Sequence, residues 1–399
     1  MFLHGSNSTF LTQSRLLIVT APPHALPLKV DPVPRPSLAP IAAHLPQTVP
    51  FVGPETLERR QHAAFLARLG ANESPFGAAP AALAAMATAV ETGWKYGDPE
   101  THDLRQALAR HHGIASDNIV AGEGIDGLLG LAVRLYAAPG STVVTSLGAY
   151  PTLNYHAAGF GARIVSVPYR NNAEDLEALA TAARQEQAAI VYLANPDNPM
   201  GSWHGAAAVS DFIDAIPGRT LILLDEAYGE FAPAGTLPAL DTGRPNLLRL
   251  RTFSKAYGMA GLRCGYAIGE QQTIAAFERV RNHFGLNAIA QAGAIAALAA
   301  PVHLTRVLQQ TADARQRIAE IASANGLVPL PSATNFVTVD CGRDASYAAG
   351  LLTALAEQRI FIRKPMAPGL DHCIRISVGT PAELDILEAA LPRALAALG

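Results

Sequence analysis

The stretch Leu221-Ile222-Leu223-Leu224-Asp225-Glu226-Ala227-Tyr228 places an acid directly after a run of four apolar residues. An uninterrupted apolar run predicts a strand over 221–224 that is buried on both faces, as in a parallel sheet covered by helices. The carboxyl end of such a strand is where open α/β sheets bind their ligands. A buried acid is costly unless it is paired, so Asp225 is either a ligand-binding carboxylate or a loop or helix-capping residue.

Similar apolar runs recur on both sides of this stretch and alternate with helix-like segments. We expect strands over 118–121, 142–146, 163–167, 189–194, 221–224, 247–252 and 264–268. We expect helices over 101–112, 127–136, 175–186 and 206–215. This alternation predicts an α/β large domain with a mostly parallel sheet that helices cover on both faces.

A different order of elements begins near residue 300. We expect helices over 305–325, 347–358 and 381–398, and strands over 335–340, 361–364 and 373–378. This order predicts a small α+β domain. We expect the large domain to span 71–289 and the small domain to combine 46–70 with 290–399. Residues 1–45 are expected to form a disordered extension.

Composition excludes several classes of protein. Only 16% of the 399 residues are charged, against about 25% in an average domain. The net charge of −3 offers no basic face for nucleic acid. Cys264, Cys341 and Cys373 are too few and too scattered for a disulfide scaffold or a metal cluster, and fit a reduced cytoplasmic enzyme. The uncharged run 282–305 is interrupted by polar residues, so we expect a buried helix joining the two domains and no membrane span.

Gly122-Glu123-Gly124-Ile125-Asp126-Gly127 fits the GxGxxG pattern of dinucleotide-binding proteins. That function also requires an acid at the end of the next strand, to hold the ribose. The next strand ends at Thr145-Ser146-Leu147-Gly148, which contains no acid. A glycine-rich turn that opens a helix still presents N–H groups to an anion, so it predicts a phosphate site and not a dinucleotide site.

Two further turns follow predicted strands. In 251–265, Lys255 stands among hydroxyl residues and glycines, and Arg263 follows eight residues later. Lys255 is a phosphate ligand, an amine nucleophile or a surface residue, and Arg263 is a candidate phosphate cation. In 195–201, Asn198 lies in a turn with two X-Pro steps, which is denser than a tight turn requires. Together with Asp225, these residues supply what a phosphorylated pyridine aldehyde cofactor needs.

With these motifs, the sequence resembles the class I/II aminotransferases of fold type I, which use pyridoxal 5′-phosphate (PLP). It is most similar to the histidinol-phosphate aminotransferase branch, over roughly residues 48–399. The motifs that match are Ser254-Lys255-Ala256 with Gly261-Leu262-Arg263, Asp225-Glu226-Ala227-Tyr228, Asn198-Pro199-Met200-Gly201, Asn72-Glu73-Ser74-Pro75-Phe76-Gly77, Tyr96-Gly97-Asp98 and Arg375-Ile376-Ser377-Val378-Gly379-Thr380.

The resemblance assigns roles to these residues. It implies that Lys255 is the Schiff-base lysine and the base of the proton shift, and that Asp225 pairs with the pyridinium nitrogen. Tyr228 and Asn198 would contact the phenolate oxygen of the cofactor, and Tyr150 would stack on its ring. The phosphate would be held by Gly124, Ile125, Asp126, Thr252, Ser254 and Arg263. Tyr96 would reach the phosphate of a neighbouring subunit, which implies a homodimer with shared active sites.

The resemblance also implies substrate-binding residues, and one of them departs from the pattern of the branch. Arg375 would grip an α-carboxylate, Asn72 would lie at the substrate mouth, and Arg363 matches the phosphate contact of the histidinol-phosphate branch. Phe51 stands where that branch has a tyrosine, and it lacks the hydroxyl. The implied reaction is a ping-pong transfer of an amino group to a 2-oxo acid. A PLP-dependent decarboxylase or lyase, and a non-catalytic ligand-binding protein of this fold, stay open as alternatives.

Overall fold

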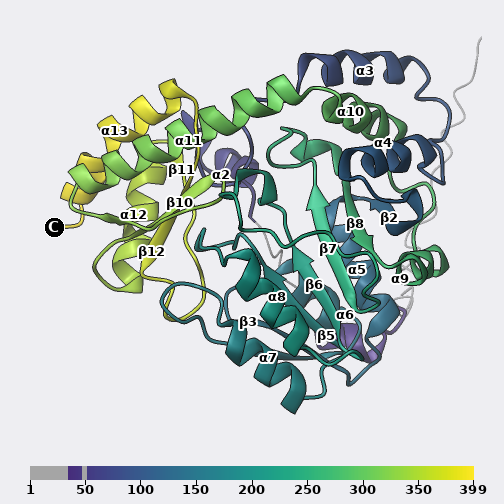
Figure 1. Cartoon of the computed structure of the whole chain (residues 1–399). Helices are drawn as coiled ribbons and strands as arrows, with labels where there is room; N and C mark the ends of the chain where they lie inside the picture. The colour runs from purple at the N-terminus through teal and green to yellow at the C-terminus, as the bar shows by residue number, and fades with distance from the viewer. Residues whose placement is uncertain (1–34, 47–51) are drawn as a thin grey trace, which may run out of the picture.

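The computed structural model describes residues 35–46 and 52–399 (Figure 1). Most of the expected N-terminal extension, and Phe51, therefore lie outside the described residues. Within the extension, Pro40–Ala43 form the short helix α1. A second helix, α2 (Pro54–Gln61), precedes the first strand.

A seven-stranded sheet forms the centre of the molecule, with the strand order β2-β8-β7-β6-β5-β3-β4. Within this sheet β8 runs antiparallel to β2 and β7, and the remaining pairs are parallel, so the expected mostly parallel α/β sheet is confirmed. Its strands are β2 (Ile119–Gly122), β3 (Thr142–Ser146), β4 (Arg163–Val167), β5 (Ile190–Ala194), β6 (Leu221–Asp225), β7 (Leu247–Thr252) and β8 (Gly265–Gly269).

Helices cover both faces of this sheet because alternate side chains of each central strand point to opposite faces. From β6, Leu223 packs in one core with Leu128 of α5 (Gly124–Tyr136). The next residue, Leu224, packs in another core with Val209 of α8 (Ala206–Ala215). Further helices around the sheet are α3 (Pro80–Glu91), α4 (His102–His112), α6 (Thr152–Gly159), α7 (Leu176–Gln185) and α9 (Gln271–Ala275).

The uncharged run 282–305 does not form one helix, so that prediction is wrong. It holds α10 (Ala288–Leu298) and the start of α11 (Pro301–Ala324), which meet at a bend of 85°. Pro301 has no N–H and would clash inside a helix, but it is tolerated in a first turn, so a new helix begins there. Among the described residues no single helix is long and apolar enough to cross a membrane. This bent pair meets the combined criterion of length and composition only when its two helices are counted together.

The bend carries the chain from one part of the molecule to the other. α10 packs against α3 and α4 beside the large sheet, and α11 runs from there toward the C-terminal helices (Figure 1). Ile318 and Ile321 of α11 pack in a separate core together with Leu69. The domain boundaries drawn from the sequence stay a prediction, although Leu69 does share this C-terminal core.

The C-terminal part combines a small antiparallel sheet with helices, as the α+β prediction requires. The strand order is β12-β10-β9, and a parallel pair joins β1 to β11. The expected strand 361–364 is shorter, because Arg363 forms only an isolated bridge and Pro365 follows it. The elements are β1 (Ala67–Arg68), β9 (Val328–Pro329), β10 (Phe336–Asp340), α12 (Ala345–Glu357), β11 (Ile360–Phe361), β12 (Cys373–Ser377) and α13 (Pro381–Ala396).

Gly258 is a position where the fold demands glycine. Its φ is +67°, and a Cβ built there would lie 2.3 Å from the carbonyl carbon of Gly77. We expect Gly258→Ala to lower the free energy of unfolding by about 2–4 kcal/mol, from the left-handed conformation and the clash together. Denaturant unfolding measures this change.

Gly261 provides the matched control in the same turn, because a Cβ there meets no atom within 4 Å. Gly261→Ala should change the free energy of unfolding by less than about 0.5 kcal/mol. Equal effects of the two substitutions would contradict the steric argument.

Candidate functional site

Lys255 lies in the turn that follows β7, half-buried between the two parts of the molecule. Its Nζ donates a hydrogen bond to the main-chain oxygen of Asn72 at 3.1 Å, and it lies 5.7 Å from the ring centre of Tyr228. Burial lowers the pKa of Lys255 to about 8, and the charge of Arg375 acts in the same direction. A substantial fraction of the amine is therefore neutral, and hence nucleophilic, just above neutral pH.

Asp225 ends β6, and its neighbours on the sheet are Ala194 and Leu250. It is 4% exposed. The hydroxyl of Tyr192 donates to Oδ2 at 2.8 Å and the N–H of Ala227 donates to Oδ1 at 2.9 Å. Neither partner is a cation, and burial raises the pKa of Asp225 to about 6. A positively charged ligand beside this carboxylate would stabilise its ionised form.

An anion cradle lies where α5 begins. Gly124 has a φ of +75°, and a Cβ there would lie 2.5 Å from Nη2 of Arg263. The guanidinium of Arg263 also donates to Oγ of Ser254 at 3.3 Å and to Asp126 at 3.4 Å. The Oγ1 of Thr252 in turn donates to Ser254 at 2.9 Å. The structure thus brings together a helix N-terminus, two hydroxyl groups and a guanidinium, which suit a phosphate group.

Two other predicted cofactor residues border this cradle. Ile125 is 6% exposed and its side chain packs in the core beneath α5, so its backbone N–H is what it can offer an anion. Tyr150 is half-buried, and its pKa is raised by burial and by the charge of Asp126. By contrast, Tyr96 is 83% exposed, with the ring of Phe284 4.7 Å away, so in the single chain it is not buried with the site.

Asn72 connects Tyr228 to the small sheet. Its Nδ2 donates to the Tyr228 hydroxyl at 3.0 Å, and its Oδ1 accepts from Oγ of Ser377 at 2.8 Å. Asn335 donates to the main-chain oxygen of Asn72 at 3.0 Å. Sequence reasoning missed Asn335 and Ser377 as site residues, because both read as ordinary strand residues. The position of Ser377 inside the motif of Arg375 was the available signal.

Arg375 of β12 crosses to the turn that carries Asn198. Its Nη1 donates to Oδ1 of Asn198 at 2.5 Å, and its guanidinium lies 5.2 Å from the ring centre of Phe336. Arg363 faces it across an isolated β-bridge and donates to the main-chain oxygen of Val52 at 2.9 Å. Burial lowers the pKa of Arg375 to about 10, and the charge of Arg363 contributes in the same direction. Two close guanidinium groups favour an anionic ligand here.

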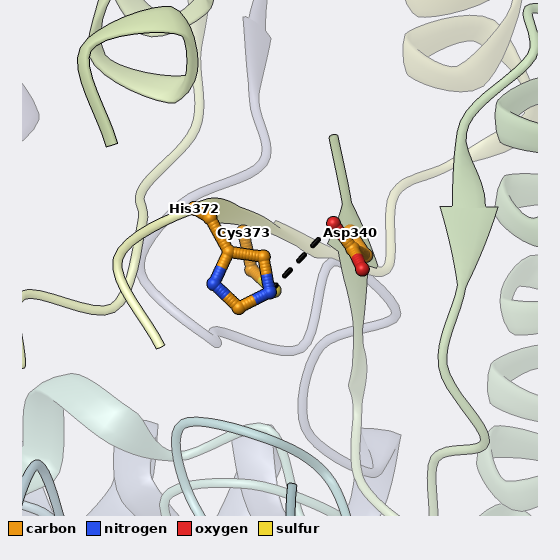
Figure 2. Close-up of side chains that lie close together, drawn as sticks. All are labelled: Asp340, His372 and Cys373. Atoms are coloured by element: carbon orange, nitrogen blue, oxygen red, sulfur yellow. Dashed lines mark ion pairs between the residues drawn. The ribbon is translucent and has the colours of Figure 1, made fainter. Parts of the chain in front are cut away.

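A second group of side chains has metal-ligand chemistry (Figure 2). The ligand atoms of Asp340, His372 and Cys373 all lie within 4.8 Å of one another. The Nε2 of His372 is 3.7 Å from Oδ1 of Asp340, and the N–H of Gly342 donates to the same oxygen. The sequence predicted no metal site and missed this group, because the pairing of β10 with β12 brings the three residues together.

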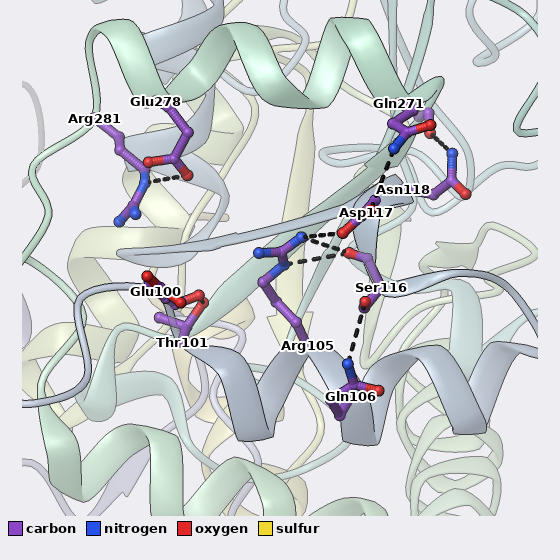
Figure 3. A network of polar contacts seen from close by, with 11 residues as sticks. Glu100, Thr101, Arg105, Gln106, Ser116, Asp117, Asn118, Gln271, Glu278 and Arg281 are labelled. Atoms are coloured by element: carbon purple, nitrogen blue, oxygen red, sulfur yellow. Dashed lines mark hydrogen bonds and ion pairs between the residues drawn. The ribbon is translucent and has the colours of Figure 1, made fainter.

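A polar network holds the outer edge of the large sheet (Figure 3). Arg105 of α4 donates to the main-chain oxygen of Ser116 at 2.9 Å and pairs with Asp117 at 3.2 Å. Gln271 of α9 donates to the same aspartate, and Asn118 donates to the oxygen of Gly269. These contacts tie α4 and α9 to the end strand β2, so the network has a structural role.

The chain matches known proteins over most of its length. Residues 66–391 match the family model described as aminotransferase class I and II. Histidinol-phosphate aminotransferase 2 of Ralstonia nicotianae is 38% identical, over 84% of this chain and 90% of the relative. Histidinol-phosphate aminotransferase 1 of Mesorhizobium japonicum is 36% identical, over 84% and 92%.

A solved structure is similar to this chain in both sequence and fold. The histidinol-phosphate aminotransferase of Sinorhizobium meliloti, in complex with pyridoxal 5′-phosphate, superposes with a TM-score of 0.89. It is 53% identical in sequence and covers 91% of this chain and 98% of its own.

PLP is the cofactor of that family, and the residues present here fit it. When bound, PLP supplies an aldehyde that combines with amines and a protonated ring that draws electrons from the substrate Cα. Asp225 offers a buried carboxylate that has no cationic partner among the described residues, which suits the ring nitrogen. Arg263, Ser254 and the start of α5 offer the phosphate cradle, and Lys255 offers the amine.

The lowered pKa of Lys255 leads to a prediction about the apoprotein. The rate at which Lys255 captures PLP should rise with pH to a midpoint near 8, because the neutral amine reacts. Arg375→Leu should move the midpoint to higher pH, because it removes a positive charge that disfavours the ammonium form. Borohydride trapping followed by mass spectrometry measures capture at this residue.

Arg317→Leu on the exposed face of α11 is the matched control, because Arg317 pairs with Asp385 of α13. It should leave the midpoint unchanged. A midpoint in the wild type near that of a free lysine, or no shift in Arg375→Leu, would contradict the prediction.

Proposed function

The chain belongs to the class I and II aminotransferases, and from this premise we propose that its amino donor is histidinol phosphate and its acceptor a 2-oxo acid. The observation that carries the proposal is the pair Arg363 and Arg375, which face each other across a β-bridge. Curated relatives at 36–38% identity are histidinol-phosphate aminotransferases, which supports the same donor.

The two arginines suit both substrates of such a reaction. A phosphate monoester is a doubly charged anion, and a guanidinium binds its oxygens through forked hydrogen bonds. Histidinol phosphate has no carboxylate, so its phosphate would occupy the region where an oxo acid places a carboxylate. Nη1 of Arg375 already donates to Asn198, and the buried Nε of Arg375 has no hydrogen-bond partner among the described residues. That free donor is available to either anion.

The remaining site residues divide the work of proton transfer. Lys255 accepts the Cα proton of the amino donor and returns it, since its lowered pKa lets the amine exist in both forms near neutral pH. Asp225 keeps the ring nitrogen of the cofactor protonated. Tyr228 is held by Asn72, and burial raises its pKa to about 12, so its hydroxyl stays protonated and can donate to the cofactor oxygen.

We also propose a cytoplasmic homodimer in which Tyr96 completes the partner's site. Near Tyr96 the single chain exposes large apolar side chains to an extent that is unusual for a monomer surface. The exposed fractions are 81% for Trp94, 83% for Tyr96, 60% for Val90 and 52% for Phe284. The three cysteines are free, as is usual in a reducing compartment.

The donor is tested by comparing histidinol phosphate with a donor that lacks the phosphate. We expect Arg363→Leu to lower kcat/KM for histidinol phosphate by about 10–100-fold, because a charge-assisted hydrogen bond to the phosphate is lost. The value for histidinol or an aromatic amino acid should change little. Steady-state kinetics on a panel of donors measures both, and Lys255→Ala should show no turnover with any donor.

An equal fall for donors with and without a phosphate would contradict the proposed role of Arg363. Wild-type turnover by Lys255→Ala would contradict the assignment of the whole site. Release of carbon dioxide without formation of an amino product would instead favour a decarboxylase.

Shared sites are tested by mixing two inactive chains, Tyr96→Ala and Lys255→Ala. If Tyr96 serves the partner's site, each hybrid dimer has one intact site and one doubly defective site. Random assortment should then restore about a quarter of wild-type activity, because half of the dimers are hybrids. Activity assays after co-expression measure this recovery. If Tyr96 served its own chain, no hybrid site would be intact and no activity would return.

A further inference from the structure

Two buried acids near the site have no role in the machinery described above. Glu174 precedes α7 and Asp197 lies in the turn after β5, and each is 2% exposed. Each carboxyl group acts on the pKa of the other, so the two lie within interaction distance. They lie beside the carboxyl ends of the parallel strands, where the turn that carries Asn198 begins.

Among the described residues, the hydrogen bonds that the Glu174 carboxyl group accepts come from neutral donors. Oγ of Ser146, at the end of β3, donates to Oε2 at 2.6 Å. The N–H of Ala194, at the end of β5, donates to Oε1 at 3.0 Å. The ring of His204 contacts the main-chain oxygen of Glu174 at 2.9 Å and not its carboxyl group. Hydroxyl and amide groups satisfy the oxygens without neutralising a charge.

Asp197 is satisfied in the same manner. The hydroxyl of Tyr169 donates to Oδ1 at 2.8 Å, and the N–H of Met200 donates to Oδ2 at 3.0 Å. The charge of Arg375 also acts on it, although Arg375 bonds the next residue, Asn198, rather than Asp197 itself. Two ionised carboxylates in contact inside the protein would repel strongly, and a hydrogen bond between them requires a proton.

We propose that Glu174 and Asp197 hold one proton between them, and that this pair positions Asn198 and partly balances the charge of Arg375. The pair ties the ends of β3 and β5 to the 195–201 turn, whose Asn198 meets Arg375 at 2.5 Å. Both acids are positioning residues. The proposal deepens the proposed function, because it rests on Arg375 as the anion-binding group of an aminotransferase site.

Electrostatics gives the pair a definite dependence on pH. Burial and the charge of Asp197 raise the pKa of Glu174 well above its ordinary value, and burial raises that of Asp197 to about 6. The other titratable groups that face the pair include Tyr169, Tyr192, Tyr228, His204 and Arg375.

The folded chain therefore retains a proton that an unfolded glutamate loses above its ordinary pKa. Stability from this source is complete below that pKa and falls as pH rises toward the pKa of the folded pair.

The first experiment uses Glu174→Gln, with Glu177→Gln as the matched control. Glu177 is an exposed acid in the first turn of α7, so its loss removes a carboxyl group without touching the pair. Wild-type protein at pH 8 should show an infrared carbonyl stretch of a protonated carboxylic acid, and Glu174→Gln should lack it while Glu177→Gln retains it. In denaturant unfolding from pH 5 to 9, the free energy of unfolding of the wild type and of Glu177→Gln should fall with a slope equivalent to about one proton. Glu174→Gln should lack this slope.

The second experiment tests positioning with a polar and an apolar replacement. The amide of Glu174→Gln can still donate to Asp197, so KM for the oxo acid should stay within about threefold of wild type. Glu174→Leu removes the carboxyl group that faces Asp197 and accepts from Ser146. KM should therefore rise about tenfold or more, with a smaller change in kcat. Thermal unfolding of each variant shows whether the fold is retained.

Three results would overturn the proposal. The first is the absence of a carboxylic-acid band in the wild type, and the second is a band that survives in Glu174→Gln. The third is a rise in KM for the oxo acid that is as large in Glu174→Gln as in Glu174→Leu, which would mean that Glu174 acts as an anion. The infrared and unfolding measurements need neither substrate nor cofactor, so they remain informative even if histidinol phosphate is not the donor.

Discussion

The hydrogen bonds of Asn72 are the interactions on which the rest of the site depends. Its main-chain oxygen accepts from Lys255 at 3.1 Å and from Asn335 at 3.0 Å, and its side chain bonds Tyr228 and Ser377. A carbonyl oxygen has two lone pairs, so both donors can be satisfied at once. One buried residue thereby joins the turn after β7 to β10 and β12, which come from the C-terminal part of the chain. The geometry of the site and the packing of the two parts are therefore set together.

How much of this could be predicted depended on whether a residue's chemistry shows in its local sequence. The position of Asp225 was predictable because an apolar strand and a parallel sheet together specify where its end lies. The phosphate turn at Gly124 was predictable for a similar reason. The helix α5 nevertheless begins at Gly124 and not at residue 127, because glycine can adopt the φ of +75° found there.

Other features could not be predicted because they arise from pairing between distant segments. Nothing in the composition of β8 states that it runs against its neighbours. The bend between α10 and α11 depends on Pro301, yet an uncharged alanine-rich run reads as one helix. Glu174 stands in an unremarkable stretch, and its burial follows from the meeting of β3 with β5. Phe51 and most of the N-terminal extension lie outside the described residues, so what the sequence implies for them stays a prediction.

The buried acids at this edge of the sheet show why the site requires a cationic ligand. Glu226 is fully buried but is neutralised by Arg249 at 2.5 Å and Arg251 at 2.9 Å. The charge of Asp197 acts on Glu174, and in our proposal one shared proton removes the repulsion between the two acids. Among the described residues, Asp225 has neither an arginine partner nor a second acid with which to share a proton. Its partners are the Tyr192 hydroxyl and the Ala227 amide. Its ionised form is therefore the one that gains most from a positive charge, and a protonated pyridine ring supplies that charge where the strand ends.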